Sequence, residues 1–208
     1  MGVSKEQAAL NRQAILNSAV RLFRERGVDA VGLVELMKEA GFTQGGFYNH
    51  FSSKQALATE VVAATLDQAK DRLTTDLEQP LAAGEDALTR QLAYYFSTGH
   101  RDDIAQGCPL AGLSGDVARL GGEAQQRFAD GLEATFTAFG TLLPPASTRS
   151  PLSDRERAMA LYSQMVGALV LARSVTDAAP ALSEEILRAA QHDALAKLAL
   201  QSGRHRHD

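Results

Sequence analysis

Apolar residues recur along this chain with the 3.6-residue period of an α-helix, and no stretch keeps the strict alternation of a half-buried strand. A first helix is predicted from about residue 6 to residue 26, with Gly27 as its stop, and a second from 33 to 40, ending at Gly41. The first helix is expected to bury Ile15, Ala19, Leu22 and Phe23, and the second Leu33, Leu36 and Met37. The pattern therefore predicts an all-α protein.

A third, short helix is predicted after a brief turn, with Thr43 as its N-cap. Its aromatic side chains are Phe47, Tyr48 and Phe51. Ser52 or Ser53 is expected to cap a long fourth helix that ends at Pro80. Three short helices in the first 52 residues thus lead into a much longer one.

Beyond Pro80 the helical signals lengthen and become less specific. One helix is predicted over 84–100, and a broken, glycine-rich segment with short helical stretches over 107–122. Another helix is predicted over 123–143, followed by a proline-rich linker to Asp154. Two final helices are expected, at 154–175 and 183–200, ahead of an unstructured tail.

Composition narrows the function classes. No segment approaches 18 uninterrupted apolar residues, which argues against a membrane span. The polar N-terminus lacks an apolar signal core, and a single cysteine, Cys108, suits the reducing cytoplasm. Net charge is −4, which argues against a generally basic coat for nucleic acid, but it divides into +1 over residues 1–60 and −5 over the remainder. The N-terminal part is therefore the better candidate for an anionic partner.

The second and third predicted helices, joined by a glycine-containing turn, form a helix-turn-helix pattern. In that motif the second helix enters the DNA major groove and its first residues face base edges. Gly45 and Gly46 weaken a helix, but missing side chains would let the backbone approach DNA closely. The residues expected to contact DNA are Thr43, Gln44, Gly45, Gly46, Tyr48, Asn49, His50 and Lys54. A compact helical packing unit with an aromatic core would carry the same pattern, so the motif alone leaves both interpretations open.

Two stretches of the N-terminal part resemble a known family. "QAILNSAVRLFRERGVDAV" and "LVELMKEAGFTQGGFYNHFSSKQAL" are similar to the DNA-binding domain of TetR/AcrR transcriptional regulators. The first matches the family's "LF-x-x-x-G" pattern. The second matches its "AG-(V/F)-(S/T)-x-G-x-(F/L)-Y-x-HF-x-(S/N)-K-x-x-L" signature at twelve positions. The matching residues are Ala40, Gly41, Phe42, Thr43, Gly45, Phe47, Tyr48, His50, Phe51, Ser53, Lys54 and Leu57. Gly32, Leu36 and Met37 depart from the usual pattern of the second helix.

The resemblance implies a function. It implies a helix-turn-helix domain over 1–52, extending into the helix from 53, and a helical effector-binding and dimerisation domain over 53–208. The protein would be a homodimeric, ligand-responsive repressor that pairs through its last two long helices. A small molecule would release it from a palindromic double-stranded DNA operator. No enzyme activity, cofactor or metal is expected.

Cys108 lies between Gly107 and Pro109, where it could begin a helix whose dipole favours a thiolate, with His100 and Arg101 nearby in sequence. A redox- or electrophile-sensing regulator is therefore the alternative function. A buried, inert cysteine is the simpler interpretation. An enzyme with Cys108 as nucleophile and His100 as base is a further alternative, but the sequence offers no third group to orient the pair. A helical adaptor that binds other proteins is the remaining alternative.

Ligand pockets are largely apolar, so inward-facing residues of the C-terminal part are candidates for an effector site. They are Tyr95, Phe96, Cys108, Phe128, Phe136, Tyr162 and Met165, each of which would also suit an ordinary core. Arg173 is expected to pair with an acid in the dimer interface rather than to bind an anionic ligand. A metal site formed by His100, Asp102, Asp103 and Cys108 is not favoured, because the spacing matches no closed zinc pattern. His205 and His207 are no better candidates.

Overall fold

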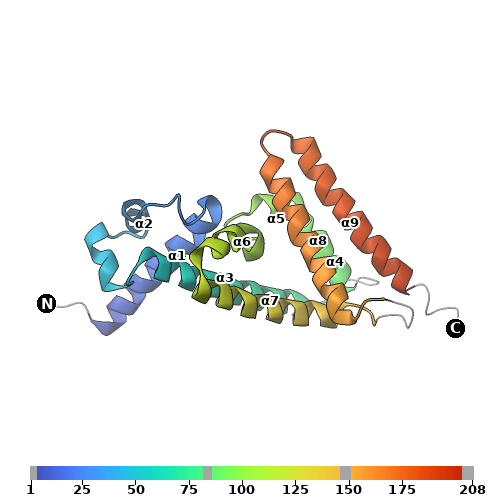
Figure 1. Cartoon of the computed structure of the whole chain (residues 1–208), viewed down its shortest axis with the longest axis horizontal. Helices are drawn as coiled ribbons and strands as arrows, with labels where there is room; N and C mark the ends of the chain where they lie inside the picture. Colours follow the sequence, from blue (N-terminus) through green and yellow to red (C-terminus); the bar gives the residue numbers. More distant parts are fainter. Residues whose placement is uncertain (1–3, 82–85, 146–150, 203–208) are drawn as a thin grey trace. The chain divides into compact units, whose positions relative to one another are not determined.

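The computed structural model of the chain describes residues 4–81, 86–145 and 151–202. Within these ranges every regular element is helical, which confirms the all-α prediction (Figure 1). The chain forms two compact units. The first unit comprises Met1–Ala69 and Ile104–Gly131, and the second comprises Lys70–Asp103 and Leu132–Asp208.

Helix α1, Lys5–Arg26, opens the first unit and has a side-chain cap at its start. Ser4 Oγ accepts a hydrogen bond from the Gln7 N–H at 3.1 Å, which satisfies one of the free donors of the first turn. Gly27 ends the helix as predicted, with φ of 83°, in the left-handed region that glycine adopts without a side-chain clash. The face predicted to be buried is buried: Ile15, Ala19, Leu22 and Phe23.

Helix α2, Leu33–Glu39, ends one residue earlier than predicted. Gly41 has φ of 84°, and the Phe42 N–H reaches back to the Met37 carbonyl at 2.7 Å, while the Gly41 N–H binds the Lys38 carbonyl at 3.1 Å. These two bonds form a Schellman motif, which turns the chain sharply toward the next element. Leu33 is only half-buried, contrary to prediction.

The next element, η1, Gln44–Asn49, is a 3₁₀ turn rather than the predicted α-helix. Thr43 occupies the N-cap position, but its side chain makes no cap hydrogen bond. Two adjacent glycines in six residues weaken α-helical propagation, and short helical pieces commonly adopt the tighter 3₁₀ form. Helix α3, Lys54–Glu78, follows. Ser53 caps it, because its Oγ accepts the Ala56 N–H at 3.0 Å.

Helix α6, Pro109–Leu120, contradicts the prediction of a broken, glycine-rich segment. Proline at its first position is pre-organised for a helix start. Its buried apolar face, Leu110, Leu113 and Val117, outweighs the low helix propensity of Gly112 and Gly115. Helix α7, Gly122–Leu142, begins after Gly121, whose φ is 86°.

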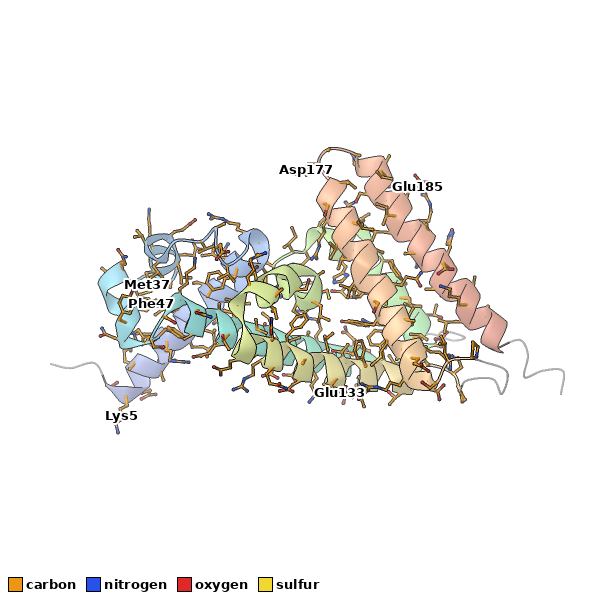
Figure 2. All side chains as sticks on the ribbon, viewed as in Figure 1. Lys5, Met37, Phe47, Glu133, Asp177 and Glu185 are labelled. Atoms are coloured by element: carbon orange, nitrogen blue, oxygen red, sulfur yellow. The ribbon has the colours of Figure 1, made fainter. Side chains whose placement is uncertain are left out.

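The buried core of the first unit joins α1, α2, η1 and α3. Figure 2 labels Met37 and Phe47, which are both fully buried and come from α2 and η1. From α1, Ile15 and Phe23 are likewise fully buried, and Leu57 and Val61 of α3 complete the set. Burial of large apolar side chains on each element, at about 1.5–3 kcal/mol apiece, is what stabilises such short helices.

In the second unit, the predicted helix over 84–100 is two helices. Helix α4, Ala87–Tyr95, ends at Phe96, and helix α5, Thr98–Asp102, starts afresh. Ser97 causes the break, because its Oγ accepts the His100 N–H at 3.1 Å and so caps the new helix. Residues 82–85 lie outside the described residues, so the predicted start of this helix does too.

Helices α8, Asp154–Val175, and α9, Pro180–Ser202, form an antiparallel pair (Figure 1). Ser153 and Glu156 form a capping box at the start of α8. Helix α9 begins at Pro180, three residues before the predicted start, because proline suits the first helical turn. The tail with His205 and His207 lies outside the described residues.

Among the described helices, α8 is the one long and apolar enough to pass a length-and-composition test for a membrane span. This is weak support for a span, because core helices of soluble proteins pass the same test. Helix α8 also carries a buried Arg157 and packs along α9. Gln164 Nε2 donates to the Ala190 carbonyl at 3.1 Å and to Asp193 at 2.7 Å. These contacts are those of a helix inside a helical protein.

Candidate nucleic-acid interface

Element η1, the predicted recognition element, buries Phe47 and exposes most of its other residues. Phe47 is fully buried and Phe51 is 3% exposed, and their rings stack with centroids 5.8 Å apart. Tyr48 meets Phe47 edge to face at 5.3 Å, yet its own side chain is 66% exposed. The two phenylalanines therefore fix the element on the core, as predicted, and leave Tyr48 directed outward.

Most residues predicted to contact DNA lie on the exposed edge. Thr43, Gln44, Gly45, Tyr48 and Asn49 are exposed, whereas Gly46, His50 and Lys54 are half-buried. The exposed set offers a hydroxyl, two amides and a phenol over seven residues, which are groups that bind phosphates and base edges. The structure thus leaves these donors and acceptors exposed within one short segment of the first unit.

The glycine pair is not required by the protein itself. A Cβ on Gly45 would have nothing within 4 Å, and one on Gly46 would meet only Met37 Cε, at an ordinary 3.8 Å. Neither glycine has a positive φ. Packing and backbone conformation therefore leave these two glycines unexplained, which is consistent with a constraint from a bound partner.

Lys54 makes a long contact within the chain. Its Nζ lies 3.5 Å from the Asp29 carbonyl, at the limit of hydrogen bonding. Such a weak bond is easily exchanged for a phosphate oxygen, so a DNA-binding role for Lys54 stays a prediction.

Arginines of α1 form ion pairs within this unit that the sequence does not indicate. Arg12 donates to both carboxylate oxygens of Glu60, at 2.5 and 2.6 Å, and lies 4.5 Å from the centroid of the Phe51 ring. This combined ion pair and cation–π contact joins α1 to α3 over the aromatic cluster. No local pattern signals it, because Arg12 and Glu60 are 48 residues apart.

Two further arginines of α1 pair with acids of α2. Arg21 binds Glu39, and Arg26 binds Glu35. The hydrogen bond from Arg26 holds the pKa of Glu35 below its usual value and raises the pKa of Arg26. These pairs are exposed, so each contributes little to stability, but they neutralise the two carboxylates of α2.

The residues predicted to form an effector site divide between the units. Cys108 and Phe128 belong to the first unit, and the other five to the second. In the second unit Tyr162 is the centre of an aromatic cluster. Its ring lies 6.3 Å from Tyr95, 6.2 Å from Phe136 and 4.9 Å from Phe139 between centroids.

Phe96 contacts Tyr95 edge to face at 5.9 Å, and Met165 is fully buried. The structure therefore brings Tyr95, Phe96, Phe136 and Tyr162 together, with Phe139 as a member that was not predicted. Packed aromatic rings of this kind equally form an ordinary core, so the ligand role stays a prediction.

Cys108 is 5% exposed and occupies the N-cap of α6, where its side chain makes no cap hydrogen bond. The neighbours suggested by sequence are engaged in the second unit. His100 Nδ1 lies 2.8 Å from the Tyr95 carbonyl, and Arg101 donates to Asp102 at 2.7 Å and to Ser183 at 3.0 Å. No group of three metal-ligating side chains occurs within residues 4–81, 86–145 and 151–202.

Arg173 binds backbone carbonyls. Its Nε donates to the Arg101 carbonyl at 2.9 Å, and its Nη2 to the carbonyls of His100 at 3.0 Å and Asp103 at 3.3 Å. A cation on the last carbonyls of α5 satisfies acceptors that the helix leaves free. The positive charge of Arg173 also contributes to the lowered pKa of Asp102. Pairing of Arg173 with an acid across a dimer interface stays a prediction.

A shallow hollow of about 260 Å³ opens on the first unit, and no residue predicted for the effector site lines it. Its lining is largely polar: Ser53, Gln55, Ala56, Thr59, Leu120, Gly122, Glu123 and Ala124. It does not resemble the apolar pocket of a drug-sized ligand.

Residues 15–61 match the family model described as "Bacterial regulatory proteins, tetR family". The HTH-type transcriptional regulator YvdT of Bacillus subtilis is 39% identical over 75 residues, covering 34% of this chain and 39% of that protein. The repressor NemR of Escherichia coli is 26% identical over 169 residues, covering 78% and 83%. The chain thus spans about two fifths of YvdT but most of NemR.

Among solved structures, the crystal structure of E. coli NemR in its reduced form superposes with a TM-score of 0.69 at 23% identity, covering 88% of this chain and 94% of that one. This likeness extends the shared fold over both units. The relatives are transcriptional regulators rather than enzymes, in agreement with the expectation for this chain. Motif, family model and fold agree: residues 15–61 carry the DNA-binding domain of the tetR family of bacterial regulatory proteins, and the relatives and solved structures support the TetR/AcrR family for the chain.

Proposed function

We propose that this protein is a homodimeric transcriptional repressor that binds a palindromic DNA operator and is released by a small molecule. The observation that carries the proposal is the exposed edge of η1, where Gln44, Gly45, Tyr48 and Asn49 face outward while Phe47 is fully buried. A rigid, short element that presents amides and a hydroxyl is suited to reading base edges in the major groove.

Dimerisation is supported by exposed apolar side chains on the α8–α9 pair. Val170 is 36% exposed, Leu171 59% and Leu182 46%, each from the helices that the family resemblance implicates. Burial of such side chains against a second copy of the chain would be favourable. Two recognition elements would then meet half-sites about 34–36 Å apart, so the operator would be palindromic.

The effector site is proposed in the second unit, around the aromatic cluster of Tyr95, Phe136 and Tyr162. A small apolar or aromatic molecule would suit such a lining. An effector acts by binding the DNA-free state better than the DNA-bound state, and the difference sets how far it weakens DNA binding. With its single cysteine, the protein is proposed to work in the cytoplasm.

The test is selection of genomic fragments with the purified full-length protein, followed by gel retardation of the enriched duplex. Affinity should fall steeply as salt rises, because phosphate contacts dominate it. Tyr48→Ala should weaken binding to all sequences, whereas Gln44→Ala should relax preference at one position of each half-site. Gln126→Ala, an exposed glutamine on α7, is the control and should leave both unchanged. Failure to enrich any duplex, from the genome or a random palindrome library, would reject DNA binding and favour the protein-binding adaptor.

A second function, sensing of electrophiles or oxidants through Cys108, is supported by its position at the N-cap of α6. The relative NemR is named a repressor, and its solved structure is described as reduced. N-Ethylmaleimide would add to the Cys108 thiolate, forming a C–S bond at one alkene carbon while the other carbon takes up a proton. If this modification releases DNA from the wild type and not from Cys108→Ser, the sensing function holds. Equal release from both variants would reject it.

A further inference from the structure

Helix α6 belongs to the same compact unit as the recognition element, although it lies about 60 residues further along the chain. Polar contacts occur at both of its ends. At its start, Arg24 Nη2 of α1 donates to the Gly107 carbonyl at 2.5 Å. At its end, Gln55 Nε2 of α3 donates to the Leu120 carbonyl at 2.7 Å. Helix α6 and the peptide that precedes it are therefore hydrogen-bonded to α1 and α3 of the same unit.

The contacts differ in their exposure to water. Arg24 is 5% exposed, and its bond to Gly107 is buried. In contrast, the side chain of Arg119, which bridges Asp116 at 2.7 Å and Asp29 at 3.6 Å, is 63% exposed. A charge-assisted hydrogen bond shielded from water is stronger and more directional than an exposed ion pair. Of these contacts, Arg24–Gly107 is the one best able to fix a position.

The carbonyl that Arg24 holds belongs to the peptide bond that leads into Cys108. Cys108 is itself buried at the N-cap of α6, so the environment of its thiol depends on where this peptide lies. At its other end, Arg24 sits next to Phe23, a fully buried residue of the core that also holds Phe47 of η1. The Arg24 side chain thus links the Gly107–Cys108 peptide to α1, the helix whose Phe23 is buried in the core of the first unit.

We infer that Arg24 is a positioning residue that couples DNA binding to the Gly107–Cys108 peptide. Coupling of this kind is reciprocal: a shift at Cys108 alters DNA affinity, and DNA binding alters the conformational freedom of Cys108 by the same factor. This inference rests on the proposed DNA-binding function. It adds that the Gly107–Cys108 peptide, in the same unit, regulates DNA binding by η1. It holds whatever the natural effector is.

The test uses the lone cysteine as a reporter. The full-length protein is labelled with N-ethylmaleimide, and the rate at Cys108 is measured by mass spectrometry with and without a saturating amount of the selected duplex. Labelling of a buried thiol requires local opening, so its rate reports that opening. In the wild type, bound DNA should slow labelling by roughly fivefold or more, within the usual range of coupling between sites.

Arg24→Met removes the bond and keeps a side chain of similar length. It should label faster than the wild type, with a rate that no longer responds to DNA, while DNA affinity stays within a few-fold. Arg127→Met, which removes only the exposed pair of Arg127 with Glu123, is the matched control and should retain the response. If DNA merely shielded Cys108 from the reagent, Arg24→Met would keep the slowing, and the inference would be wrong.

The wild-type measurement tests the inference even if Arg24→Met fails to fold. A labelling rate that saturating DNA leaves unchanged overturns the coupling while DNA binding stands. If no duplex is bound at all, the proposed function fails first, so the two failures are distinguishable. Arg24→Lys, which retains the charge, should restore part of the response.

Discussion

Leu66 of α3 packs directly against Gly131 of α7, so closely that a side chain on residue 131 would clash with it. A Cβ built on Gly131 would lie 2.6 Å from Leu66 Cδ1 and 2.9 Å from Cδ2. Real Cβ atoms do not approach carbon so closely, so any side chain at residue 131 would require the methyl groups of Leu66 to move. Helix propensity alone would favour alanine at this position by about 1 kcal/mol.

Gly131→Ala should therefore destabilise the protein despite the gain in helix propensity. Overpacking typically costs about 1–3 kcal/mol, so the net loss in the free energy of unfolding should be about 1–2 kcal/mol by chemical denaturation. Gly140→Ala in the same helix, where an added Cβ meets nothing within 4 Å, is the control and should be neutral or stabilising. In a Leu66→Ala background, Gly131→Ala should cost much less unfolding free energy, because the Leu66 atoms that the added methyl group would meet are absent. Equal effects at positions 131 and 140 would show that the crossing tolerates a side chain.

Gly45→Ala should have the opposite profile. No atom lies within 4 Å of the added methyl group and the backbone needs no positive φ, so stability should be unchanged or slightly higher. If the glycine lets the backbone approach DNA, affinity for the selected duplex should fall about tenfold or more, equivalent to ~1.4 kcal/mol. Gel retardation and thermal unfolding of the same sample separate the two effects. Gly115→Ala on α6, also without a neighbour within 4 Å, should alter neither.

Helix boundaries were predicted well where they depend only on residues close together in the sequence. Gly27 stops α1, Ser53 caps α3 and α8 begins at Asp154, each at the expected position. These are contacts between residues three or four apart, which a sequence displays directly. The 3₁₀ element η1 lies where the contiguous motif predicted a short helix, while its contacts with DNA stay a prediction.

The errors arose where a weak local preference was decided by distant packing. Gly112 and Gly115 predicted a broken segment, but the buried face of α6 made it one helix. Conversely, Ser97 divided a strong helical pattern, because its side chain capped the helix that followed. Arg24 shows the same limit at the site, since its partner lies 83 residues away and nothing in the sequence distinguishes it from Arg21.

Stability should depend on pH through Asp102. The hydrogen bond from Arg101, together with its positive charge, outweighs burial and holds the pKa of Asp102 below its usual value. Because the folded-state pKa is depressed, this stabilisation is complete above the unfolded pKa of about 3.9 and is lost as pH falls through the folded value. The difference in unfolding free energy between wild type and Asp102→Asn should thus be larger at pH 7 than at pH 3.

The expected size of this difference is modest. The Asp102 side chain is 57% exposed, so solvent screening limits the pair to about 1 kcal/mol at most. If the difference in unfolding free energy between wild type and Asp102→Asn instead grew toward low pH, the folded-state pKa of Asp102 would be raised rather than lowered, and the prediction would be wrong.

Leu171→Asp should separate the proposed dimer. The side chain is 59% exposed on α8, and in the proposed dimer it would be buried against the second copy, where an unpaired carboxylate is strongly unfavourable. Sedimentation at micromolar concentration should show a monomer for Leu171→Asp and for Leu182→Asp, and a dimer for the wild type. Leu10→Asp on α1, with a side chain 60% exposed, carries the same change outside the α8–α9 pair and should remain dimeric. Monomeric Leu171→Asp should also lose affinity for the full palindrome far more than for an isolated half-site, because the two half-sites are no longer bound as one unit. A variant that stays dimeric would place the interface on another surface of the chain.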